Sequence, residues 1–165
     1  MILPDYLRPG LDVVFCGTAA GARSARAGHY YANPGNRFWA LLAQTGLTPQ
    51  RMAPQDDHLL PALGLGLTDL CKTAAGQDAD IPASAWDAPR LLGLIRYHQP
   101  HALAFTSLTA ARLALGRPAA AGRLPADPRL AGVALWALPS PSGLARSHFS
   151  MEPWADLAEW RKAAR

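Results

Sequence analysis

Four short apolar runs recur along the chain, and turn-forming or polar residues follow each of them. They lie at residues 11–16, 65–69, 102–106 and 133–138. Most of these runs are apolar without interruption, rather than alternating between apolar and polar positions. That pattern is typical of strands that are buried on both faces, as in a parallel sheet covered by helices. We therefore predict four buried strands.

Helical spacing of apolar residues fills most of the gaps between these runs. It predicts helices over 37–46, 56–62, 88–98, 107–116 and 151–164. Asn36 and Ser150 are suitable N-caps, and Gly46 and Gly116 are suitable stops. The polar segment 73–87 is predicted to be a loop.

The alternation of strands and helices predicts an α/β fold, a three-layer sandwich with a central parallel four-stranded sheet flanked by helices. The length of 165 residues suits one domain spanning 1–165, and no repeat or long linker divides it. Ligands of such sheets bind beyond the carboxyl ends of the strands. The predicted strands lead at those ends into the loops 17–21, 69–72, 106–107 and 139–146, where we expect a ligand site.

Composition narrows the class of protein. Half of the residues are apolar and 17% are charged, which is the reverse of a disordered chain. No apolar run approaches the ~18 residues of a membrane span, and the N-terminus does not resemble a signal peptide. The two cysteines, Cys16 and Cys71, lack metal-binding spacing. We expect a cytoplasmic protein without a disulfide framework, metal site or membrane partner.

The net charge of +4 is small, but its distribution is uneven. Fourteen of the sixteen basic residues are arginine, which a GC-rich genome explains as well as function does. Placement is more informative, because three stretches contain arginines and no carboxylate: 17–50, 88–126 and 128–151. Two of them include the glycine- and proline-rich loops at the predicted strand ends. Such loops suit a polyanion, since nearby carboxylates would repel its phosphates.

The first of these loops begins with Gly17-Thr-Ala-Ala-Gly21, which matches neither dinucleotide nor P-loop spacing. About fifteen residues are predicted to pass before a helix begins, so no helix N-terminus would face a phosphate there. The small residues either expose backbone to a flat ligand or form an ordinary turn. Of Tyr30 and Tyr31, we expect one ring in the core and the other available to stack on a base.

Two further segments carry candidate chemistry. Asp69 ends the second predicted strand, where a carboxylate either positions a water and stabilises a cation or caps a turn. The stiff segment 139–146 offers serine hydroxyls, an apolar Leu144 and a following Arg146. These residues suit phosphate contacts and a wedge into a base stack, although a rigid connector would explain the prolines.

Four blocks together resemble the mismatch-specific uracil-DNA glycosylase / thymine-DNA glycosylase family. They are Val13-Val-Phe-Cys-Gly17, Ala32-Asn-Pro-Gly-Asn-Arg-Phe-Trp39, Gly66-Leu-Thr-Asp-Leu70 and Leu138-Pro-Ser-Pro-Ser-Gly-Leu-Ala-Arg146. The resemblance runs in order over about residues 8–160. It implies the uracil-DNA glycosylase fold and a monomeric DNA repair enzyme of the bacterial nucleoid. The implied partner is double-stranded DNA containing uracil or mismatches, and no cofactor is implied.

The resemblance also implies roles for individual positions. The base pocket would be formed by Gly17, Thr18, Ala19 and Gly21, with Ser24 and Asn33 at its wall and Tyr31 stacking on the flipped base. The wedge would be Gly143, Leu144, Ala145 and Arg146, and the DNA backbone would be contacted by Ser140 and Ser142.

One position departs from the family pattern. The first motif of the family usually reads Gly-Ile-Asn-Pro-Gly, and its asparagine holds the hydrolytic water, whereas this chain has Ala19. Asp69 is the nearest substitute, because a carboxylate stabilises an oxocarbenium ion and activates water. No lysine is placed to form an imine, so a monofunctional enzyme is expected. The alternatives are a binding module for damaged bases without catalysis and a nucleoside- or nucleotide-processing enzyme.

Overall fold

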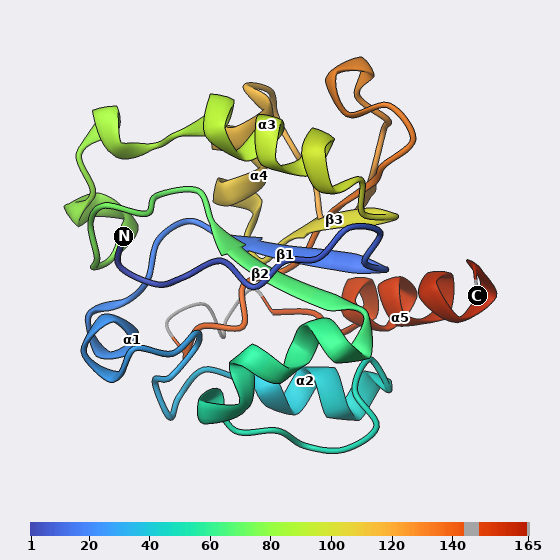
Figure 1. Cartoon of the computed structure of the whole chain (residues 1–165), viewed down its shortest axis with the longest axis horizontal. Coiled ribbons are helices and arrows are strands. Elements are labelled where there is room, and N and C mark those ends of the chain that lie inside the picture. Colours follow the sequence, from blue (N-terminus) through green and yellow to red (C-terminus); the bar gives the residue numbers. More distant parts are fainter. Residues whose placement is uncertain (144–148, 165) are drawn as a thin grey trace.

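A computed structural model describes residues 1–143 and 149–164 of the chain. Within them lies a five-stranded sheet in the order β2-β1-β3-β5-β4 (Figure 1). The strands are β1 (Val13–Gly17), β2 (Leu65–Asp69), β3 (Ala102–Phe105), β4 (Gly122–Leu124) and β5 (Ala134–Ala137). β2, β1, β3 and β5 are parallel, and β4 pairs with β5 in the antiparallel direction. The carboxyl ends of the four parallel strands therefore share one edge.

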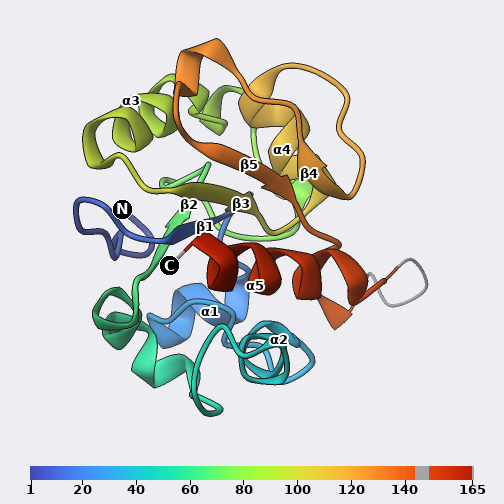
Figure 2. The same ribbon diagram turned by 90° about the vertical axis from the view of Figure 1, so that its right-hand side faces the viewer.

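Helices cover both faces of this sheet (Figure 2). The α-helices are α1 (Ala22–Ala27), α2 (Phe38–Thr45), α3 (Ala88–His98), α4 (Leu108–Leu115) and α5 (Glu152–Ala164). The 3-10 helices are η1 (Pro54–Leu63), η2 (Asp78–Asp80), η3 (Ala83–Ala85) and η4 (Pro128–Leu130). α3 and α4 lie on one side of the sheet, and α1, α2 and α5 lie on the other. No helix of the described residues has both the length and the apolar character needed to cross a membrane.

The strand residues divide between two hydrophobic clusters because successive side chains point to opposite faces. Val13 and Phe15 belong to the cluster under α2 and α5, and Val14 and Cys16 to the cluster under α3 and α4. The Phe15 ring meets Phe38 of α2 edge to face at 5.3 Å between centroids. All five residues of β1 are buried, as the apolar run predicted. The three-layer α/β fold is thus confirmed.

Several elements differ from the prediction. The helix predicted over 56–62 is a 3-10 helix, η1, and the predicted loop 73–87 contains two short 3-10 helices, η2 and η3. The sheet has a fifth strand, β4, whose sequence Gly-Arg-Leu is too short and polar to form an apolar run. A helix, α1, begins directly after Gly21, where a long loop was predicted. Its sequence, Ala-Arg-Ser-Ala-Arg-Ala, has no apolar stripe, so spacing did not reveal it. Gly28 ends α1 in the left-handed conformation, with φ of 77°.

The chain before β1 lies along β2 and reaches the carboxyl edge of the sheet. Tyr6 forms an antiparallel bridge to Leu67, with 3.0 Å in each of its two backbone hydrogen bonds. The backbone N–H of Ile2 donates to the carbonyl of Lys72 at 2.7 Å. These contacts bring a segment that is remote in sequence against the end of β2.

Candidate active site

Three oxygen atoms from different parts of the chain converge over Gly17 at the end of β1. A methyl group added at Gly17 would lie 2.8 Å from Asp69 Oδ1 and 3.3 Å from both Thr106 Oγ1 and the Tyr31 hydroxyl. Asp69 ends β2, directly beside Gly17 in the sheet, and Thr106 follows β3. Glycine is required here because any side chain would displace these oxygens. The result is a small polar site at the edge where parallel sheets bind ligands.

Asp69 is the buried acid of this site, with 4% of its surface exposed. Burial raises the pKa of Asp69 to about 6, because a charged carboxylate loses hydration there. The positive charges of Lys72 and Arg90 and a backbone hydrogen bond from Gly17 lower this pKa, whereas the charge of Asp5 raises it. Asp69 therefore titrates close to neutral pH, where it can accept a proton and still be ionised at pH 7.

Tyr31 forms one side of the site in a strained backbone conformation. Its φ of 51° lies in the left-handed region, which is uncommon for a residue other than glycine. The ring stacks on Phe38 with 4.0 Å between centroids, and its hydroxyl lies 2.9 Å from Thr106 Oγ1. Burial, followed by the charge of Asp69, raises the pKa of Tyr31, so the phenol stays protonated. Tyr30, in contrast, is in the core, as expected of one member of the pair.

A cluster of charged side chains lies next to Asp69. The Asp5 carboxylate lies 3.0 Å from Lys72 Nζ, accepts a hydrogen bond from Thr68 Oγ1 at 2.7 Å, and also pairs with Arg90. Lys72 is buried and also donates to the Tyr30 hydroxyl at 2.9 Å. Arg90 Nη1 lies 3.5 Å from the main-chain oxygen of Asp69. The cluster thus joins the N-terminal segment, the end of β2 and α3.

The other predicted pocket residues are mostly engaged in holding the first loop. Thr18 Oγ1 donates to Asp78 at 2.7 Å, and Ser24 Oγ accepts from the backbone N–H of Ala32 at 3.0 Å. Asn33 is exposed and its side chain accepts from the N–H of Gly35, which closes a local turn. Ala19 is half-buried beside Gly17. Gly21 precedes α1, where an added methyl group would meet nothing within 4 Å.

The predicted DNA-contacting loop is described as far as Gly143. The hydroxyl oxygen of Ser140 accepts from the N–H of Ser142 at 3.2 Å, which closes a local turn. An added methyl group at Gly143 would lie 3.2 Å from the Gly35 carbonyl, so this loop packs against the 33–36 segment. The remaining predicted wedge residues, Leu144, Ala145 and Arg146, lie outside the described residues.

Arg37 links the predicted DNA-contacting loop to the segment that carries Asn33 of the predicted pocket wall. Its backbone N–H donates to the Pro141 carbonyl at 2.9 Å, and its guanidinium lies 3.9 Å from the centroid of the Phe149 ring. Trp154 of α5 braces the same loop through a hydrogen bond to Pro139 O at 2.9 Å. Residues 139 and 141 of the loop are therefore held by Arg37, which precedes α2, and by Trp154 of α5.

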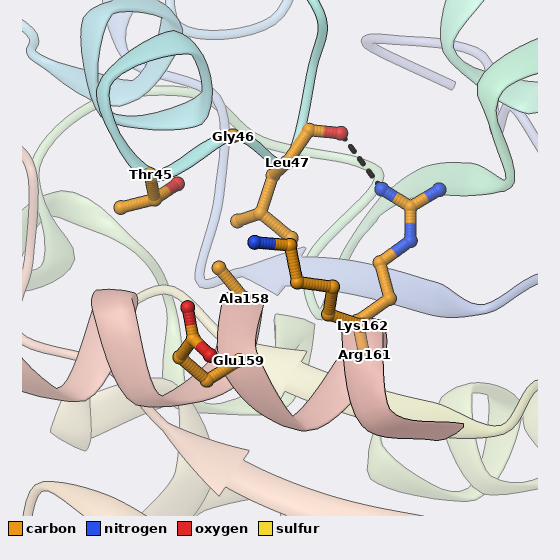
Figure 3. Close-up of a pocket in the computed structure, with 7 residues that line it drawn as sticks. All are labelled: Thr45, Gly46, Leu47, Ala158, Glu159, Arg161 and Lys162. Atoms are coloured by element: carbon orange, nitrogen blue, oxygen red, sulfur yellow. Dashed lines mark hydrogen bonds between the residues drawn. The ribbon is translucent and has the colours of Figure 1, made fainter. Parts of the chain in front are cut away.

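A cavity of about 190 Å³ lies between α2 and α5 (Figure 3). It is lined by Thr45, Gly46, Leu47, Ala158, Glu159, Arg161 and Lys162. Arg161 binds Asp12 at 2.9 Å and the carbonyls of Leu47 and Leu63. Asp12 and Leu63 precede β1 and β2, so the cavity lies at the amino ends of the strands. Asp69 lies at the opposite edge, where β2 ends.

Among residues 1–143 and 149–164, no three His, Cys, Asp or Glu side chains gather as metal ligands. The structure adds Thr106 and the cluster of Asp5, Lys72 and Arg90 to the residues selected from the sequence. Thr106 had one sequence signal, its place at the carboxyl end of the strand predicted over 102–106. The cluster had none, because Asp5 and Arg90 are separated by 85 positions and meet only in the fold.

Comparison with known proteins agrees with this architecture. The family model of the Uracil DNA glycosylase superfamily matches residues 4–164. The fold is also similar to the solution NMR structure of a protein from Methanosarcina acetivorans, provisionally assigned as a uracil DNA glycosylase. The two share 21% sequence identity with a TM-score of 0.71, over 97% of this chain and 96% of that one. Because the family model spans nearly the whole chain, the protein belongs to the uracil DNA glycosylase superfamily.

Proposed function

We propose that this protein is a DNA N-glycosylase that removes uracil from G·U mismatches, and other damaged pyrimidines, without a lyase step. Membership of the superfamily supports a hydrolase acting on N-glycosidic bonds in DNA. The observation that carries the proposal is the buried carboxylate of Asp69 over Gly17, with a pKa of about 6 at the ligand-binding edge. Preference for a mismatch follows because a mispaired base costs less to flip.

In the proposed reaction the C1′–N1 bond breaks and its electron pair leaves with the uracil ring. Ionised Asp69 stabilises the oxocarbenium character that develops on the sugar. A water molecule then adds to C1′, and Asp69 accepts its proton. Asp69 thereby serves in place of the asparagine that the family usually has at the position of Ala19.

The surroundings of Asp69 suit this chemistry. The Tyr31 ring is half-buried at this site and stacks on Phe38, which supports a role as a platform for a flipped base. Lys72 is buried between Asp5 and the Tyr30 hydroxyl, so its amine is held away from an imine-forming role. Gly143, the last described residue of the loop, lies beside Gly35, which supports a wedge role for Gly143 to Arg146 and backbone contacts by Ser140 and Ser142.

The test is release of free base from a labelled duplex with one G·U pair, with DNA binding measured in parallel. Asp69→Asn and Asp69→Ala are expected to bind the duplex normally and to lose release by orders of magnitude. Asp156→Asn, the same change at an exposed position on α5, is the matched control and keeps full activity. Release by Asp69→Ala at the wild-type rate would refute the catalytic assignment.

The same assay separates the alternatives. Binding of uracil-containing duplex without release by the wild type would identify a binding module, for which Ala19 is the motivating observation. Absence of both binding and release would favour an enzyme that acts on free nucleosides or nucleotides. Leu144→Ala tests the wedge, because its loss should reduce release from duplex more than release from single-stranded DNA.

A further inference from the structure

The charged cluster beside Asp69 is not used by the proposed reaction, although it is built from three separate parts of the chain. Asp5 belongs to the N-terminal segment, Lys72 follows β2, and Arg90 lies in α3. Lys72 is 6% exposed, and the Arg90 side chain is 26% exposed. Burying this much charge is costly unless every group is paired, and Asp5 pairs with both cations. An apolar contact would join these three segments with a smaller cost in desolvation free energy. The presence of the charges therefore needs another explanation.

We propose that Asp5, Lys72 and Arg90 are positioning residues, which hold the carboxyl end of β2 and set the electrostatic field at the Asp69 carboxylate. The inference rests on the proposed function, in which ionised Asp69 is the catalytic group. The cluster reaches Asp69 through Arg90, which contacts its main-chain oxygen, and through Lys72, three residues farther along the chain. Asp5 holds both cations in place through its two carboxylate oxygens.

The sign of each contribution follows from its charge. Lys72 and Arg90 favour the ionised form of Asp69, and Asp5 opposes them. The other titratable groups facing Asp69 are Tyr30, Tyr31 and Cys16, and burial raises the pKa of all three, so they remain neutral. The net field at Asp69 is therefore set by the three charges of the cluster.

The experiment is the pH dependence of single-turnover base release from the G·U duplex. The wild type is expected to lose activity as the pH falls through about 6, where Asp69 becomes protonated. The acidic limb of the pH profile is the range in which activity falls with decreasing pH. Asp5→Asn should move this acidic limb to lower pH, and Arg90→Gln should move it to higher pH, each by about one pH unit. Arg96→Gln, the same change at an exposed position of α3, is the matched control and leaves the limb unchanged.

Opposite shifts separate this role from a structural one, because damage to the fold lowers release at every pH without moving the limb in two directions. Arg90→Lys, which keeps the charge, should restore the wild-type limb. Unchanged limbs in both variants, or shifts in the same direction, would overturn the inference. Should Asp5→Asn fail to fold, Arg90→Gln decides alone, since its side chain is partly exposed.

A second measurement keeps this inference distinct from the proposed function. The ¹³C chemical shift of the Asp69 carboxyl is titrated in the DNA-free protein, with Asp69→Asn identifying the signal. The same opposite displacements of the Asp69 titration are expected in Asp5→Asn and Arg90→Gln. If the wild type releases no base, the proposed function fails while this titration still confirms or refutes the electrostatic role.

Discussion

Replacement of Asp69 by asparagine should make the protein more stable while abolishing base release. The folded protein holds the Asp69 proton up to about pH 6, whereas an ordinary aspartate releases it near 3.8. Because the pKa of Asp69 is raised from 3.8 to about 6, ionisation of Asp69 lowers the stability of the folded protein by about 3 kcal/mol at pH 7. Asparagine carries no charge and therefore escapes this cost. A residue kept at such a cost is characteristic of a functional site.

The stability difference between Asp69→Asn and the wild type should depend on pH, in a direction set by the protonation of Asp69. Between about pH 4 and pH 6 the folded state retains a proton that the unfolded state has lost, so the wild type becomes less stable as pH rises. The advantage of Asp69→Asn should therefore be small near pH 4, grow through this window and level off above about pH 6. Urea unfolding at several pH values measures it directly.

The exposed Asp156→Asn variant is the control, and it should differ from the wild type by no more than about 0.5 kcal/mol at any pH. An Asp69→Asn variant that is no more stable than the wild type at pH 8 would refute the reasoning. So would a difference that does not change with pH, because the cost would then not come from ionisation.

Three further substitutions test the geometry. Gly17→Ala places a methyl group 2.8 Å from Asp69 Oδ1, so base release should be lost while circular dichroism shows a folded protein. Thr106→Val removes the hydroxyl that contacts the Tyr31 hydroxyl at 2.9 Å, and urea unfolding should show a loss of about 1 kcal/mol. Arg161→Met removes bonds that join α5 to the amino ends of β1 and β2, with a destabilisation of about 3 kcal/mol and a lower melting temperature. Equal stability of the last variant would show that these bonds contribute little.

Elements that bury many apolar side chains were the ones that the sequence pattern predicted. The buried strands at 65–69 and 102–105 and the helix Ala88–His98 agree with the apolar runs and spacing that predicted them. The two strands are buried on both faces and therefore form continuous apolar runs, whereas the helix buries one face, so its apolar residues recur at helical spacing. β4 and α1 bury little, and their sequences carried no such signal.

The sequence by itself determined the layered α/β class and the place of Asp69 at the carboxyl edge of the sheet, where parallel sheets generally bind ligands. Tertiary structure decided the environment of that acid. Gly17 ends β1, Thr106 follows the neighbouring strand β3, and Tyr31 comes from the segment between α1 and α2, so only the fold brings them together. The pairing of Asp5 with Lys72 and Arg90 likewise joins distant parts of the chain. Local sequence patterns indicate which residues are buried. The electrostatic field at a buried carboxylate depends on charges that come close to it only in the folded protein.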